Sequence, residues 1–126
     1  MGKRKVRDEH HRRPKSLDGT DDPRNISIVD NNHHKWWHII FGNMNAYQIC
    51  GHLNLSYHKP QNTRVGIIFV GETEVIKVGK RGSSDPILSL DAWNKLFKGK
   101  TFGQIVEWIN DVFGDPEYCF ELIPIK

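Results

Sequence analysis

Histidines are the residues of this chain whose spacing points most directly to chemistry. Of the seven in 126 residues, His10 and His11 are adjacent, and His34 and His38 are four residues apart. Neutral imidazoles from two such segments can bind one divalent metal ion and leave coordination positions open for water or substrate. We predict that the two segments meet and form one metal site.

The segment that carries these histidines must fold so that their side chains converge. Turn residues and apolar alternation divide it into a strand at residues 6–11, a loop at 15–24, a strand at 26–29 and a helix at 31–41. Asp30 can cap the start of the helix, and Gly42 suits its end. Asn45 can cap a second short helix, which runs to Leu53.

The geometry of these elements divides the histidines by role. His34 and His38 lie on one face of the predicted helix. His10 and His11 leave a strand on opposite sides, so one joins the helix pair at the metal and the other stays free as a base. His33 lies about 100° around the helix from His34 and should miss the ion. The alternatives are surface histidines on a polar helix, or a metal site that is only structural.

The order of these residues resembles that of the HNH endonucleases, which carry a ββα-metal motif. The matching signature is His10-His11, Asn25 fourteen residues later, His34 nine residues after Asn25, and His38. The His-His start and the helix histidines are most similar to the nuclease domains of DNase-type colicins. Residues 37–44 resemble a helix ending in small bacterial and phage HNH proteins. The resemblance covers residues 8–54.

The resemblance implies a role for each residue of the signature. It implies three metal ligands, His10, His34 and His38. His11 would be the general base that activates water, and Asn25 would hold the loop to the strand and fix the orientation of His11. Asp8 would orient a ligand or a phosphate-binding arginine.

The implied cofactor is one divalent metal ion. It would polarise the scissile phosphate and stabilise the leaving oxygen. Imidazole ligands favour Zn, Ni, Co or Mn over Mg, whereas HNH family members accept Mg or Mn. The sequence therefore leaves the identity of the ion open among Zn, Mn, Mg and Ni.

Basic residues gather at the N-terminus of a chain whose formal net charge is +3. Residues 1–15 hold seven lysines and arginines against two acidic residues. A basic arm beside a metal site favours a polyphosphate ligand. We predict nucleic-acid contacts from Arg7, Arg12, Arg13 and Lys15, with DNA as the substrate and RNA as an alternative. The other interpretation of the charge run is a solvated terminus.

The CxxC zinc knuckles that staple many HNH proteins are missing, since Cys50 and Cys119 are isolated. Isolated cysteines indicate a reduced protein without a disulfide framework. No apolar run approaches the roughly 20 residues that span a bilayer, and the charged N-terminus does not read as a signal peptide. We expect a cytoplasmic protein with no membrane partner, in the host cell if a phage or mobile element encodes it. Its motif should be supported by the second half of the chain.

The second half shows strand and helix signals but no histidine. We expect a hairpin of residues 64–70 and 73–78, a loop at 80–86, a strand at 87–90, helices capped by Asp91 and Thr101, and a last strand at 118–123. The predicted fold class is α+β. Residues 1–58 form the ββα-metal motif with its following short helix, and residues 59–126 form a mixed α/β part that packs with it as one unit.

A weak internal repeat relates the two halves. A shift of 56 residues aligns Trp37, Ile40, Phe41, Asn45, Gln48, Ile49, Leu53 and Asn54 with Trp93, Leu96, Phe97, Thr101, Gln104, Ile105, Ile109 and Asn110. The second copy lacks every histidine, and Asn94 stands where His38 stands in the first. A degenerate duplication is one interpretation, and chance similarity between two amphipathic helix pairs is the other.

The predicted function is metal-dependent hydrolysis of DNA phosphodiester bonds by an HNH endonuclease. The alternative is a catalytically silent protein derived from one, which binds nucleic acid or acts as a phage inhibitor or accessory factor. His11 discriminates between them, because a structural metal site needs no free base beside its ligands. The sequence leaves a homodimer open, and with it the choice between nicking and double-strand cleavage.

Overall fold

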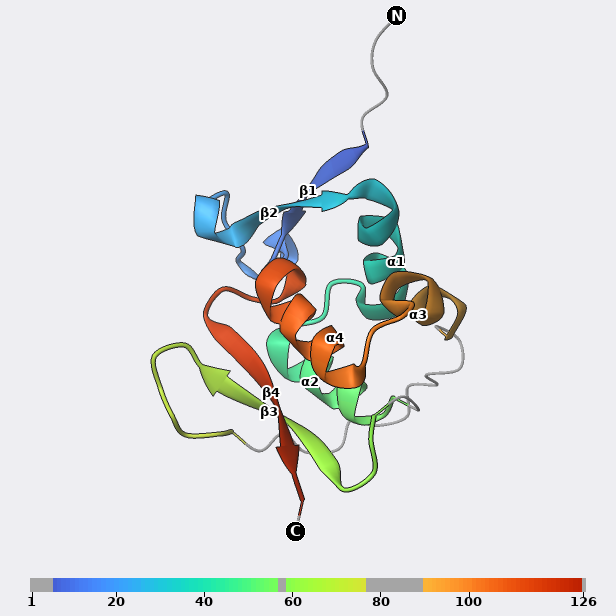
Figure 1. The fold of residues 1–126 in the computed structure, drawn as a ribbon. Helices are drawn as coiled ribbons and strands as arrows, with labels where there is room; N and C mark the ends of the chain where they lie inside the picture. The colour runs from blue at the N-terminus through green and yellow to red at the C-terminus, as the bar shows by residue number, and fades with distance from the viewer. Residues whose placement is uncertain (1–5, 57–58, 77–89, 126) are drawn as a thin grey trace, which may run out of the picture.

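The structure, a computed structural model, describes residues 6–56, 59–76 and 90–125. These residues contain two antiparallel pairs of strands and four α-helices, which confirms the predicted α+β class. The two strand pairs lie at opposite ends of the molecule, with helices between them (Figure 1).

The N-terminal unit is a strand pair followed directly by a helix. Strand β1 (Arg7–His11) pairs with strand β2 (Ile26–Asp30), and helix α1 (Asn31–Phe41) follows. The register places His10 opposite Ser27. The connection between the strands contains two short 3-10 turns, η1 (Lys15–Leu17) and η2 (Pro23–Asn25).

Both predicted ends of α1 are confirmed. The Asp30 side chain accepts hydrogen bonds from the backbone N–H groups of Asn32 and His33, so it caps the helix start. Gly42 ends the helix at a φ of +56°, a conformation that glycine adopts without steric cost. The face of α1 that carries the histidines is therefore fixed by signals local to the helix.

The other three helices are α2 (Ala46–Asn54), α3 (Leu90–Phe97) and α4 (Phe102–Trp108). Both α2 and α4 begin in a capping box, in which Asn45 or Thr101 exchanges hydrogen bonds with a glutamine three residues later. Helix α4 continues into a five-residue π-helical turn, η4 (Ile109–Phe113). None of the helices in the described residues is long and apolar enough to cross a membrane.

The second strand pair differs from the prediction. Strand β3 (Thr63–Phe69) pairs with strand β4 (Tyr118–Pro124), a partner that the sequence did not predict. The predicted hairpin of residues 64–70 and 73–78 is borne out in part. Within the described part of that segment, Ile76 makes an isolated bridge to Ile67. Residues 77 and 78 lie outside the described residues.

Side chains pack closely over Gly66 of β3. A Cβ atom at Gly66 would lie 2.5 Å from Val75 and 2.8 Å from Ile123. Val75, in the chain that follows β3, therefore packs on the strand pair over Gly66. The seven-residue ladder with β4 leaves Val65 and Ile67 fully buried.

Part of the second half lies outside the described residues. The predicted loop 80–86 falls there, as do residues 87–89 of the predicted strand 87–90. Helix α3 begins at Leu90, so Asp91 lies in its first turn instead of capping it. Shifts of one or two residues are common at helix boundaries.

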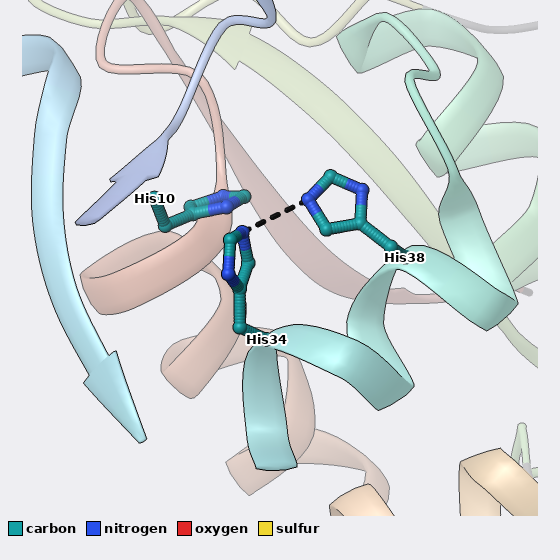
Figure 2. Close-up of side chains that lie close together, drawn as sticks. All are labelled: His10, His34 and His38. Carbon is teal, nitrogen blue, oxygen red and sulfur yellow. Dashed lines mark hydrogen bonds between the residues drawn. The ribbon is translucent and has the colours of Figure 1, made fainter. Parts of the chain in front are cut away.

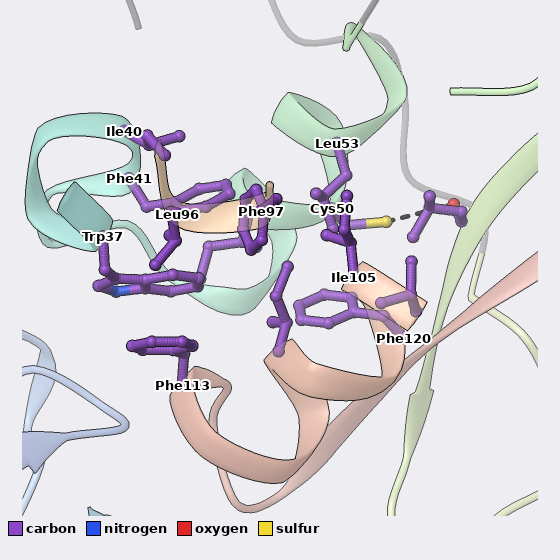
Figure 3. Packing of buried hydrophobic residues seen from close by; sticks show 14 of the residues in the cluster. Trp37, Ile40, Phe41, Cys50, Leu53, Leu96, Phe97, Ile105, Phe113 and Phe120 are labelled. Atoms are coloured by element: carbon purple, nitrogen blue, oxygen red, sulfur yellow. Dashed lines mark hydrogen bonds between the residues drawn. The ribbon is translucent and has the colours of Figure 1, made fainter. Parts of the chain in front are cut away.

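One apolar core extends through both halves of the chain (Figure 3). The Trp37 ring of α1 stacks on the Phe113 ring of η4, with centroids 4.6 Å apart. Leu53 of α2 and Ile109 of η4 are fully buried in the same cluster. The helix that carries the histidines is thus packed directly against the C-terminal half.

Candidate metal centre

Three of the predicted histidines meet at one point. His10 comes from β1, and His34 and His38 come from one face of α1 (Figure 2). Each offers a ring nitrogen, and these nitrogens all lie within 4.8 Å of one another. The cluster could hold a metal ion, as expected from the sequence. His33 lies outside it and packs edge-on against Trp108, with ring centroids 5.2 Å apart.

His10 is the buried member of the cluster, with 2% of its surface exposed. Its Nε2 lies 2.9 Å from the carbonyl oxygen of Phe113, which can only accept, so Nε2 carries the proton. Its Nδ1 is buried and has no hydrogen-bond partner among the described atoms. Burial, with a smaller contribution from His34 and His38, lowers the pKa of His10 to about 4. A neutral ring with a free Nδ1 lone pair is the form that binds metal.

The two helix histidines are held through their outer nitrogens. Nδ1 of His34 lies 3.1 Å from Oδ2 of Asp8, and Nδ1 of His38 lies 3.2 Å from the carbonyl oxygen of Gly42. Both oxygens accept, so Nδ1 carries the proton of each neutral ring. The Nε2 atoms then lie 3.0 Å apart with their lone pairs facing each other, an arrangement that either a metal ion or a proton shared between the rings would relieve. Burial and the neighbouring His34 lower the pKa of His38, which favours a metal ion over a proton there.

All three rings therefore share one pattern. In each ring one nitrogen lies against a carbonyl or carboxylate oxygen: Nε2 of His10 and the Nδ1 atoms of His34 and His38. The other nitrogen of each ring is the one left to bind a metal ion. In metal sites such partners fix the tautomer and the orientation of the ligating ring. Asp8, which the sequence suggested as an orienting acid, lies where it can do this for His34.

Local sequence explains why the rings converge. Alternation along β1 sends His10 inward, and the i,i+4 spacing puts His34 and His38 on one face of α1. Gly42 donates its N–H to the carbonyl of His38, and the positive φ then turns its own carbonyl back to the His38 ring. The helix cap is thus also a partner of the cluster.

His11 lies outside the cluster and has a carboxylate partner of its own. Its Nε2 is 2.9 Å from Oδ1 of Asp21, which belongs to the connection between β1 and β2. The hydrogen bond to His11, with a further contribution from Lys15, lowers the pKa of the exposed Asp21 carboxyl. Asp21 was not predicted, although the acidic pair at residues 21 and 22 of a loop beside the histidines was a visible signal.

Asn25 ties the connection to the end of β1. Its Oδ1 accepts from the Arg13 N–H at 2.7 Å, and its Nδ2 donates to the carbonyls of Arg13 and Thr20 at 3.1 and 2.8 Å. Its own carbonyl accepts from the N–H of Arg12. Asn25 is buried and so braces the backbone immediately after His11, where the sequence placed that role.

Arg12, predicted to contact nucleic acid, has its guanidinium turned into the protein. It donates to the carbonyl oxygens of Asn110, Asp111 and Gly114. Burial lowers the pKa of this guanidinium. The sequence signal for Arg12, its place in a charge run, says nothing about which partner an arginine takes.

Arg13, also predicted to contact nucleic acid, is paired with two acidic side chains. Its Nε lies 2.7 Å from Asp115 and its Nη2 lies 2.8 Å from Glu117. These hydrogen bonds, with Asp115 the larger contributor, raise the pKa of Arg13. Of the four predicted basic contacts, Arg7 and Lys15 remain as exposed side chains.

A comparison of the chain with protein-family models finds no match, and searches of curated proteins and of solved structures find none. The resemblance to HNH endonucleases therefore rests on the residue order of the sequence alone and stays a prediction.

Proposed function

We propose that the protein is a metal-dependent endonuclease of the HNH type, which hydrolyses DNA phosphodiester bonds. The observation that carries the proposal is the set of three imidazoles on a strand pair and its helix. Each outer nitrogen is bound to an acceptor, and the inner Nδ1 of His10 is buried without a partner. A buried nitrogen left unpaired costs roughly 1–3 kcal/mol, so a bound ion would remove a defect in the fold.

The number of ligands supports a catalytic site over a structural one. Structural zinc sites are closed by four protein ligands, whereas catalytic sites keep a position for water or substrate. The cluster in the described residues has three histidines and no fourth ligand within its reach. The donor set therefore fits an ion that also contacts a substrate.

The ion itself is proposed to be Zn, Ni, Co or Mn by ligand type, with Mg as the alternative that the family resemblance adds. Bound by the three histidines, it would act as a Lewis acid that polarises the phosphodiester and stabilises developing negative charge. The remaining roles belong to side chains of the ββα unit.

His11 is the proposed general base. Asp21 accepts a hydrogen bond from Nε2 of His11, which leaves Nδ1 as the nitrogen that can take a proton from water. Asn25 holds the backbone that follows His11, and Asp8 orients His34. Each of these roles keeps a ring in one orientation before the substrate arrives.

The proposed substrate contacts are basic. Arg7 and Lys15 are exposed at the two ends of the segment that carries His10 and His11. The sequence adds three more basic residues in the N-terminal arm, Lys3, Arg4 and Lys5. Cationic side chains near a metal favour the phosphate backbone of DNA, and RNA is the alternative substrate.

A cleavage panel tests the proposal. Supercoiled plasmid is incubated with the protein and Mg, Mn, Co, Ni or Zn in turn, with a structured RNA in parallel. We expect cleavage of DNA with at least one ion, and His11→Ala should abolish it while metal binding is retained. His33→Gln is the matched control, because His33 lies on α1 outside the cluster, and it should still cut. If the plasmid and the RNA both stay intact with every ion, the proposed endonuclease activity is refuted.

The second candidate function is nucleic-acid binding without catalysis, by a protein that the metal ion stabilises. One observation favours it: His10 is held by Phe113 of the C-terminal half, so a bound ion would also tie the two halves together. This candidate expects a chelator to lower the melting temperature of a protein that cuts nothing. His11→Ala would then leave every measured property unchanged.

A further inference from the structure

Five consecutive backbone carbonyls of the C-terminal half dock on the β1–β2 pair. They belong to residues 110, 111, 112, 113 and 114, at the end of the π-helical turn η4. Arg12 donates to three of them, Ser27 donates to the carbonyl of Val112 at 2.5 Å, and His10 donates to that of Phe113. These three donors share one face of the strand pair, because His10 lies opposite Ser27 and two residues before Arg12.

The π-helical turn makes these carbonyls available. The last carbonyls of any helix lack partners within the helix and need donors from elsewhere. Here the N–H of Gly114 bonds back to the carbonyl of Ile109 at 2.6 Å, five residues away, which widens the final turn. Such turns occur often at functional sites. The carbonyls that follow Ile109 then point at β1 and β2 instead of at solvent.

We propose that η4 is the positioning element of the metal centre, with the Phe113 carbonyl as the group that prepares His10 to bind metal. The inference rests on the proposed metal site and deepens it. Arg12 and Ser27 are positioning residues that act through η4, since they hold the carbonyls on either side of Phe113.

The proton on the His10 ring gives this contact its importance. The ring has two neutral tautomers, and only one leaves a lone pair on Nδ1, the buried nitrogen that has no hydrogen-bond partner among the described atoms. The Phe113 carbonyl selects that tautomer because it can accept a proton from Nε2 but cannot donate one. Without the carbonyl in place, the proton can move to Nδ1 and block the ligand position.

Phe113 also connects His10 to the helix histidines. Its backbone holds His10, while its ring stacks on Trp37 with an interplanar angle of 7°. Trp37 is the residue directly before His38 on α1. One residue of the C-terminal half therefore fixes the relative placement of the strand ligand and the helix ligands.

Two measurements on the full chain test the inference. Nitrogen-15 NMR of the metal-free protein reports which His10 nitrogen carries the proton, with the signals assigned by His10→Gln. Competition titration with Zn and with Ni reports affinity. Ser27→Ala and Arg12→Gln remove the donors to η4, and Ser27→Thr and Arg12→Lys restore a hydroxyl or a positive charge. Arg24→Gln is the matched control, since the exposed Arg24 pairs with its neighbour Asp22 in the β1–β2 connection and lies outside the contacts to η4.

We expect a single Nε2-protonated tautomer of His10 in the unaltered protein and in Arg24→Gln. Ser27→Ala and Arg12→Gln should show a mixed tautomer and bind Zn or Ni about 10- to 100-fold more weakly, the range seen when partners of metal ligands are removed. Ser27→Thr should recover most of the affinity. Circular dichroism checks folding, and if Arg12→Gln does not fold, Ser27→Ala carries the test.

Unchanged affinity and an unchanged tautomer in folded Ser27→Ala and, where it folds, Arg12→Gln would overturn the inference. So would an Nδ1-protonated His10 in the unaltered protein. If the variants bind metal more weakly but the protein cuts no nucleic acid, the inference about η4 stands and the proposed endonuclease activity is refuted. The failure of the inference and the failure of the proposed function are therefore distinguishable.

Discussion

Residues 31–76 and 90–125 run through the same series of elements: a helix, a capped helix and a strand. These are α1, α2 and β3 in the first region, and α3, α4 and β4 in the second. Both second helices start in a capping box with glutamine. Asn54 bonds the N–H and the carbonyl of Val65 in β3, and Asn110 bonds those of Phe120 in β4, at 2.8 to 3.0 Å.

The two regions differ in what they add to this common packing. The first carries His34 and His38, whereas the positions 56 residues later hold Leu90 and Asn94. The second instead extends its capped helix by η4, which supplies the backbone carbonyl of Phe113 to His10. One region thus contributes ligand side chains and the other contributes main-chain acceptors. The predicted duplication stays a prediction about origin, while the shared caps and asparagine contacts are features of the structure.

The largest expected difference between the regions is in metal binding. His38→Ala should weaken Zn or Ni binding by more than about 100-fold, because losing a ligand exceeds the 10- to 100-fold cost of losing a ligand's partner. Asn94→Ala, at the matching position of α3, should leave affinity unchanged. Competition titration of both variants measures this. Equal losses of metal affinity in the two variants would show that metal binding does not distinguish the two regions.

Substitution of Asn54 and of Asn110 should affect stability alike but metal binding differently. Asn54→Ala and Asn110→Ala each leave an N–H and a carbonyl of a strand residue without their side-chain partner. We expect each to lower the free energy of unfolding by about 2 kcal/mol. Only Asn110→Ala should also weaken metal binding, since Asn110 lies in η4. Urea unfolding measures the stability of both variants, and titration with Zn or Ni measures their metal affinity. Weaker metal binding in Asn54→Ala would contradict the prediction.

Metal removal should have a moderate effect on stability. An ion at ten times its dissociation constant stabilises the native state by roughly 1.4 kcal/mol if it does not bind the unfolded chain. We therefore expect chelator to lower the melting temperature of the unaltered protein and of Asn94→Ala. His34→Ala should melt at the same temperature with and without chelator. A chelator response that survives in His34→Ala would place the ion elsewhere.

The smallest expected effect is shared by both regions. Asn45→Ala and Thr101→Ala each remove a helix N-cap, which should lower the free energy of unfolding by about 1 kcal/mol. The two losses should be similar, because both capping boxes make the same pair of hydrogen bonds. The shift in the midpoint of denaturant unfolding measures each loss, provided that the dependence of the unfolding free energy on denaturant concentration is unchanged. Losses that differ by more than the measurement error would weaken the structural likeness of the regions.

The sequence predicts those structural features that depend only on residues close together in the chain. The caps at Asp30, Asn45 and Thr101 and the glycine end of α1 are local hydrogen-bonding or backbone preferences, so they could be identified without a fold. The i,i+4 histidines needed only the helix period. In each case a few adjacent residues contain the whole physical cause.

What the sequence did not predict depends on partners far along the chain. Strand β3 pairs with β4, some fifty residues away, because together they cover the core and leave room over Gly66 for Val75. The carbonyl of Phe113 has no sequence signature, since every residue carries one. The charge of Arg12 and Arg13 could be read, but whether a guanidinium faces phosphate or a helix end is decided by tertiary packing.

The pairing of β3 with β4 also determines how the protein responds to dilution. If the two regions were separate molecules, their strands would meet only in a dimer, and assembly would fall with concentration. In one chain the strands meet at an effective concentration that dilution does not change. The turn that holds His10 therefore stays in place in a single molecule, whatever the abundance of the protein.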